Sequence, residues 1–211
     1  MIKSISCGIS ACLLTGILFA NDFVTSTNPL DGEHWNDKWK KVEEFQNKGL
    51  PKSAIKELNS IYDEAVKESS WAAATRAFCQ RIYVEGQVNQ PLFPFAIRQL
   101  NDAIPKSNQQ MRPVLETVRA CYLYQYYLQN QWRFRNRSQT SSLPSDDFET
   151  WDLTRILSEI DKSFTTALES ADQLKKIPIA DYDVLLEKGN IPDSHRPTLY
   201  DFVAFQALGF Y

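Results

Sequence analysis

The sequence predicts an all-α fold, an irregular stack of antiparallel helical hairpins arranged like a short solenoid. Apolar residues recur at spacings of three and four along most of the chain, as they do on one face of a helix. Glycine and proline stand between these stretches, where they end one helix or open the next. We find no stretch with the alternation of apolar and polar residues that is typical of a strand.

The first 20 residues have the features of a secretory signal peptide. Lys3 supplies a positive charge, an uncharged apolar run extends from Ile5 to Phe19, and Ala20 provides a cleavage point. This run is short for the ~30 Å apolar core of a membrane, which favours a cleaved signal over an uncleaved anchor. Lipid attachment at Cys12 is disfavoured because apolar residues continue after it. We therefore expect an exported protein that meets the membrane only through this segment.

The remaining chain predicts one helical domain with an acidic surface. Residues 21–34 are polar and are expected to form a flexible leader, and residues 35–211 form the domain. The whole chain has 23 Lys and Arg against 26 Asp and Glu; without Lys3 the balance is 22 to 26, a net charge of −4. Nucleic-acid binding needs a positive surface, so this class of partner is not expected.

The first three predicted helices form the clearest hairpins. The first apolar stripe consists of Trp35, Trp39, Val42 and Phe45. Gly49 ends this helix as a left-handed cap, and Pro51 opens the next one at a position that tolerates proline. A third helix is expected from Trp71 to about Val84, capped by Ser69 or Ser70. The span from Lys48 to Val84 is close to the ~34-residue period of tetratricopeptide repeats, although no clear second copy follows.

Four further helices are predicted, at Phe93–Ile104, Gln109–Asn130, Leu153–Lys176 and Thr198–Tyr211. Asp152 is placed to cap the third of these. Thr198 and Asp201 resemble a capping box for the last. Two looser stretches, Ser138–Asp147 and Ile177–Pro197, separate the helices.

The residues predict no catalytic, cofactor or metal site. The two histidines lie outside any metal-binding spacing, and neither CxxC, GxSxG nor a phosphate-binding glycine loop occurs. We therefore predict that the chain is not an enzyme and takes no cofactor. Cys79 and Cys121 remain after signal removal, and they either form a disulfide in an oxidising compartment or stay as two buried thiols.

One cluster combines arginine with large aromatic rings: Trp132, Arg133, Phe134, Arg135 and Arg137. It could bind an anion or a nucleic-acid strand, since guanidinium groups bind phosphate and rings stack on bases. We favour a structural role, with both rings plugging the core at a helix end. The arginines would then pair with the carboxylates that follow, Asp146, Asp147, Glu149 and Asp152.

Several stretches resemble the N-terminal helical region of large bacterial alpha-2-macroglobulin-like proteins. They are Trp39–Glu44, Lys48–Ala54, Gln131–Arg137, Thr150–Leu153, Ile177–Ile179 and Arg196–Phe202. The resemblance implies an exported protein of the periplasm or cell envelope that traps or inhibits endopeptidases. In that class the bait segment, the β-sandwich domains and any reactive thioester lie downstream. None of these is found here, and no thioester role passes to Cys79 or Cys121.

We therefore expect a non-catalytic N-terminal scaffold or docking module of such a protease inhibitor. Because the sequence ends at Tyr211 within a helical stretch, we expect it to be the front of a larger protein. Its partners would be the downstream macroglobulin domains or an envelope protein, with proteases reached through the full-length protein. The alternative is a free-standing periplasmic adaptor that binds a peptide or protein in a groove lined by Trp71, Tyr122 and Tyr126.

From the sequence alone, Arg135→Ala is expected to lower the melting temperature, because it would break the proposed pairing with carboxylates. An unchanged melting temperature would contradict the structural role of the cluster.

Overall fold

The computed structural model describes residues 33–89, 91–136, 147–182 and 193–211, and within these ranges it is mostly helical. This confirms the predicted all-α class. The α-helices are α2 (Glu33–Asn47), α3 (Pro51–Lys67), α4 (Trp71–Asn89), α5 (Leu92–Ala103), α6 (Arg112–Gln129), α7 (Gln131–Arg135), α8 (Leu153–Leu168), α9 (Ala171–Leu174) and α10 (Leu199–Phe210). Short 3-10 helices are η1 (Ile104–Lys106), η2 (Phe148–Thr150), η3 (Ile179–Tyr182) and η4 (Asp193–His195).

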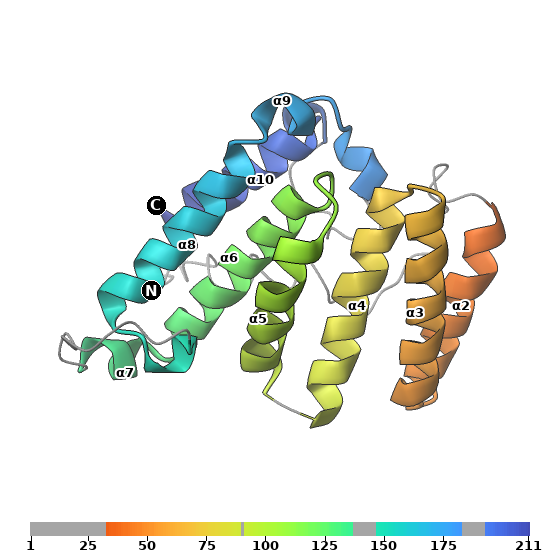
Figure 1. Ribbon diagram of the computed structural model, residues 1–211, viewed down its shortest axis with the longest axis horizontal. Helices are drawn as coiled ribbons and strands as arrows, with labels where there is room; N and C mark the ends of the chain where they lie inside the picture. The colour runs from red at the N-terminus through yellow and green to blue at the C-terminus, as the bar shows by residue number, and fades with distance from the viewer. Residues whose placement is uncertain (1–32, 90, 137–146, 183–192) are drawn as a thin grey trace, which may run out of the picture.

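The long helices stand side by side in a row, and successive helices run in opposite directions (Figure 1). The closest neighbours are α3 with α4 and α6 with α8, and α10 packs behind this last pair. The row is thus a stack of antiparallel helices, as predicted, whereas its likeness to a tetratricopeptide repeat stays a prediction. Among the described helices, none is both long and apolar enough to cross a membrane.

The two turns that flank α3 have the same left-handed geometry with different residues. Gly49 has φ +65°, and the Leu50 amide donates to the Phe45 carbonyl at 2.8 Å. After α3, Ser69 takes φ +58°, and the Ser70 amide donates to the Ala65 carbonyl at 2.8 Å. Gly49 was predicted for this role. Of the two serines predicted to cap α4, Ser69 lies in the turn that ends α3, and Ser70 directly precedes α4.

Several predicted helix boundaries are wrong. Helix α4 continues past Val84 to Asn89, and it contains Gly86 at a point where it lies close to Leu92 of α5. The predicted helix Leu153–Lys176 is broken after Leu168 into α8 and α9. The break allows Leu174 to be fully buried. Helix α2 begins at Glu33, so the last two residues of the predicted leader are helical. Residues 1–32, which include the predicted signal peptide, lie outside the described part.

The predicted caps of the last two long helices are confirmed. The Asp152 side chain accepts a hydrogen bond from the Arg155 amide at 2.8 Å. At α10, the Thr198 amide donates to the Asp201 carboxylate at 2.9 Å, and the Asp201 amide donates to the Thr198 hydroxyl at 3.4 Å. These bonds satisfy amides that have no partner within the helix, so both starts are encoded locally.

Replacement of Gly86 by valine is expected to lower the free energy of unfolding by about 1–3 kcal/mol, through overpacking between α4 and α5. A Cβ atom at this position would lie 2.9 Å from Leu92 Cδ1 and 3.4 Å from Leu92 Cα. Urea denaturation measures the change. As a control on the same helix, Val88→Ala removes an exposed side chain and is expected to change stability by less than ~0.5 kcal/mol.

Candidate functional site

The two rings of the predicted cluster point in different directions. Phe134 is 1% exposed and packs on Tyr126 and Tyr127, with ring centroids 6.1 and 5.8 Å away. Trp132 is 69% exposed, so the prediction that it plugs the core is wrong. The two residues are two apart on helix α7, and residues at that spacing do not share a face.

The arginines of the cluster also differ from the prediction. The Arg133 guanidinium donates to the Tyr126 hydroxyl at 3.3 Å and to the Glu149 carbonyl at 3.1 Å, which ties α7 to η2. Arg135 is exposed, and among the described residues its guanidinium donates to Gln131 on its own helix, at 3.5 Å. The Glu149 carboxylate pairs with Arg98 of α5.

The cluster is therefore partly structural, through Phe134 and Arg133, and Arg135 pairs with none of the predicted carboxylates that lie in the described ranges. Asp152 caps α8, and Asp147 accepts from the Glu149 amide at 3.2 Å. Arg137 and Asp146 lie outside the described residues.

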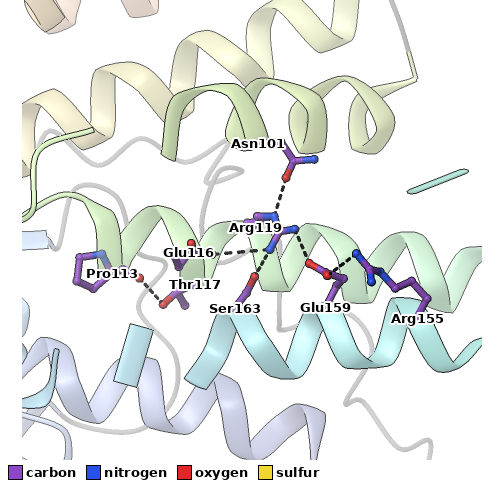
Figure 2. Close-up of polar contacts among 8 residues, drawn as sticks. All are labelled: Asn101, Pro113, Glu116, Thr117, Arg119, Arg155, Glu159 and Ser163. Atoms are coloured by element: carbon purple, nitrogen blue, oxygen red, sulfur yellow. Dashed lines mark hydrogen bonds and ion pairs between the residues drawn. The ribbon is translucent and has the colours of Figure 1, made fainter. Parts of the chain in front are cut away.

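A buried arginine–carboxylate network of the predicted kind exists elsewhere, centred on Arg119 of α6 (Figure 2). Its guanidinium donates to Asn101 of α5 at 2.6 Å and to Glu159 of α8 at 3.0 Å. A third bond goes to the hydroxyl of Ser163, also on α8. The Arg119 and Glu159 side chains are only 13% and 11% exposed. One side chain thus joins three helices.

Two further residues balance the charge of this network. Glu116 lies 3.8 Å from the Arg119 guanidinium, and Arg155 lies 3.0 Å from the second Glu159 oxygen (Figure 2). Two guanidinium groups therefore face two carboxylates. The sequence carried a signal for both pairs, since Glu116–Arg119 and Arg155–Glu159 have the i,i+3 and i,i+4 spacings of neighbours on a helix.

Cys79 and Cys121 are free, buried thiols, so the structure contains the second of the two predicted alternatives and lacks the disulfide. Burial raises the pKa of each thiol to about 12. Burial, and then the charges of these two thiols, raise the pKa of Tyr122 well above its ordinary value. Thiols held in the protonated form are poor nucleophiles, which suits a packing role.

The aromatic positions named for a peptide groove are closed. Tyr122 and Tyr126 are buried in the core, and Trp71 packs against it half-buried. A separate cavity of about 200 Å³ lies between the α3–α4 and α5–α6 hairpins, and it is mainly apolar. Its lining residues are Tyr62, Phe78, Ala103, Lys106, Ser107, Met111 and Leu115.

The described ranges offer few side chains that are suited to catalysis or metal binding. These ranges contain no cluster of three His, Cys, Asp or Glu that could hold a metal ion. His195 lies exposed on η4.

The first and last helices of the described chain, α2 and α10, have different outward surfaces. The outward side of α2 is charged, with Asp37, Lys40, Lys41 and Glu44 exposed to solvent. The outward side of α10, formed by Ala204, Phe205, Leu208 and Tyr211, is apolar; we call it the α10 outer face. Leu208 is 72% exposed, and Phe205 and Tyr211 are also exposed. Exposed apolar side chains that lie next to one another on one helix make this the candidate interaction surface of the described residues.

Comparison of the chain with protein-family models, with curated proteins and with solved structures finds no match. The resemblance to the macroglobulin-like helical region accordingly stays a prediction. The α10 outer face is the candidate functional surface that the geometry offers.

Arg119→Ala is expected to lower the free energy of unfolding by about 2–4 kcal/mol, because Glu159 would lose one of its two guanidinium partners in a poorly solvated position, and Asn101 and Ser163 would lose theirs. Thermal and urea denaturation measure the change. The matched control is Arg135→Ala, because the Arg135 side chain is exposed. The sequence alone predicted a lower melting temperature for this variant. From the structure we expect its free energy of unfolding to change by less than ~0.5 kcal/mol. An Arg119→Ala variant as stable as the control would contradict the role of the network.

Stability is expected to fall at alkaline pH. The thiols of Cys79 and Cys121 have an ordinary pKa of 9.0, which folding raises to about 12. Between these values the folded chain holds protons that the unfolded chain has released, so the free energy of unfolding decreases as pH rises. Their contribution is complete below pH 9. Urea denaturation across this range should show a shallower decline for the Cys79→Ala/Cys121→Ala variant; an equal decline would assign the effect to other groups, such as Tyr122.

Proposed function

We propose that this chain is a non-catalytic docking module of an exported alpha-2-macroglobulin-like endopeptidase inhibitor, working in the periplasm or cell envelope. Its helical stack positions the α10 outer face, and that face binds the downstream macroglobulin domains or an envelope partner. Proteases are met by the full-length protein and not by this module. The class and the location rest on the sequence resemblance and on the signal-like residues 1–20.

The observation that carries the docking role is the contrast between the outward sides of α2 and α10, the first and last helices of the described chain. Terminal units of stacked-helix proteins need a polar outer side to stay soluble, because each unit buries its apolar side only against its neighbour. Helix α2 meets this requirement with charged side chains, and α10 does not. The α10 outer face is therefore suited to burial against another surface.

The alternative function, a free-standing adaptor with an aromatic groove, has less support. Tyr122 and Tyr126 are buried, so a peptide could reach them only if the helices separated. The cavity between the hairpins offers only about 200 Å³, which suits one side chain better than a peptide.

The test compares two double variants of the full chain expressed from its own gene. Phe205→Glu/Leu208→Glu places charge on the α10 outer face, and Val88→Glu/Trp132→Glu places the same charge on exposed apolar positions elsewhere. We expect both variants to fold, as judged by circular dichroism, and only the first to lose its assembly in size-exclusion chromatography of the cell-envelope fraction. Identical elution of both variants and the parent protein would contradict the docking role.

A further inference from the structure

The cavity between the α3–α4 and α5–α6 hairpins is large for a space inside a protein. Its volume is about 200 Å³, whereas packed interiors hold few voids larger than one water molecule. Both hairpins contribute to its wall, and it lies at the end of the row where α5 passes through η1 into α6 (Figure 1). An engineered apolar cavity of about 150 Å³ binds benzene, so this one has room for a single ring with a short substituent.

The inner wall of the cavity is apolar and partly aromatic. Phe78, Met111 and Leu115 are buried there. The Tyr62 and Phe78 rings are neighbours, with centroids 6.3 Å apart and planes tilted by 45°. Water is a poor occupant of such a space, because a buried water needs two to four polar partners. Rings pack well on other rings and on a thioether, so this wall favours an aromatic occupant.

The solvent side of the cavity carries one positive charge. Lys106 of η1 lines the cavity and is exposed. Its ammonium has no hydrogen-bond or ion-pair partner among the described residues, Asp102 one turn earlier included. No described carboxylate lines the cavity. The Ser107 hydroxyl already donates to the Ile104 carbonyl at 2.8 Å, so the charge of Lys106 is what the rim offers to a ligand.

The size of the cavity limits the ligand further. Sites for drug-sized molecules measure about 300–1,000 Å³, and this one is smaller. A second ring or a long chain would exceed it. A negative group on a short arm would reach from the aromatic wall to the rim, where it stays hydrated and meets Lys106. Shape and charge together therefore select a small acid with one ring.

We propose that this cavity is a binding site for a small aromatic monocarboxylate. The ring packs against Tyr62, Phe78 and Met111, and the carboxylate faces the Lys106 ammonium at the rim. The site is separate from the α10 outer face and does not depend on the docking function. Because the ligand contacts both hairpins, its binding stabilises the folded chain as the ligand concentration rises above the dissociation constant.

NMR of the purified full chain labelled with ¹³C-methyl methionine tests the proposal, with 3-phenylpropionate as the probe. The sequence has two methionines, Met1 and Met111, so one signal reports on the cavity wall. We expect the Met111 signal to shift and saturate with a dissociation constant on the order of 0.1–1 mM. The neutral analogue 3-phenylpropionamide should bind roughly 2- to 5-fold more weakly, because an exposed ion pair contributes little.

Three variants separate the charge from the cavity. Lys106→Met keeps an apolar stem and removes the charge, so the acid and the amide should then bind equally well. The matched control is Lys52→Met on α3, an exposed lysine about 15 Å along the helix from Tyr62, which should retain the preference for the acid. Ala103→Leu narrows the cavity and should abolish the shift of Met111.

Three outcomes overturn the proposal. They are an unmoved Met111 signal at about 10 mM acid, equal binding of acid and amide by the parent chain, and a preference for the acid that survives in Lys106→Met. If Ala103→Leu fails to fold, as judged by circular dichroism, the exposed Lys106→Met variant still decides. These measurements concern the cavity alone, so their failure leaves the assembly test of the α10 outer face untouched.

Discussion

The guanidinium group of Arg119 fixes how the later helices of the stack meet. It binds Asn101 on α5 and both Glu159 and Ser163 on α8, so three helices share one hydrogen-bonding centre. Buried ion pairs add little free energy when compared with well-packed apolar residues, because desolvation offsets their attraction. Their geometry is directional, however, and a helix that slid or rotated by one position would leave a carboxylate unpaired. The network therefore sets the register in which α5, α6 and α8 pack.

The parts of this structure that follow from local rules could be predicted from the sequence. The apolar stripes, the turn at Gly49 and the caps at Asp152 and Thr198 all depend on residues a few positions apart. The errors concern contacts between distant residues. Nothing within α7 says that Phe134 faces the core while Trp132 faces solvent, since this depends on where Tyr126 lies. The pairing of Arg119 with Glu159, forty residues apart, was missed for the same reason.

The candidate site shows the same difference between features set by neighbouring residues and features set by distant contacts. A search for chemical motifs drew attention to an arginine-rich stretch, which proved to be partly a brace between α7 and η2. The α10 outer face has no motif at all, and its residues look like ordinary core residues in the sequence. Only the fold shows that one half of α10 is buried and the other half is not. A surface defined by missing polarity can be recognised only when the neighbours of each residue are known.

The two left-handed turns on either side of α3 differ in what stabilises them. Glycine adopts positive φ at almost no cost, so the turn at Gly49 can form in a chain that is otherwise unfolded. The same conformation costs serine at position 69 about 1 kcal/mol, because its Cβ is crowded by the backbone. The packing of α3 on α4, which is the most extensive contact in the stack and buries Ala65 and Ala74, offsets this cost. The turn at Ser69 therefore depends on tertiary packing in a way that the turn at Gly49 does not.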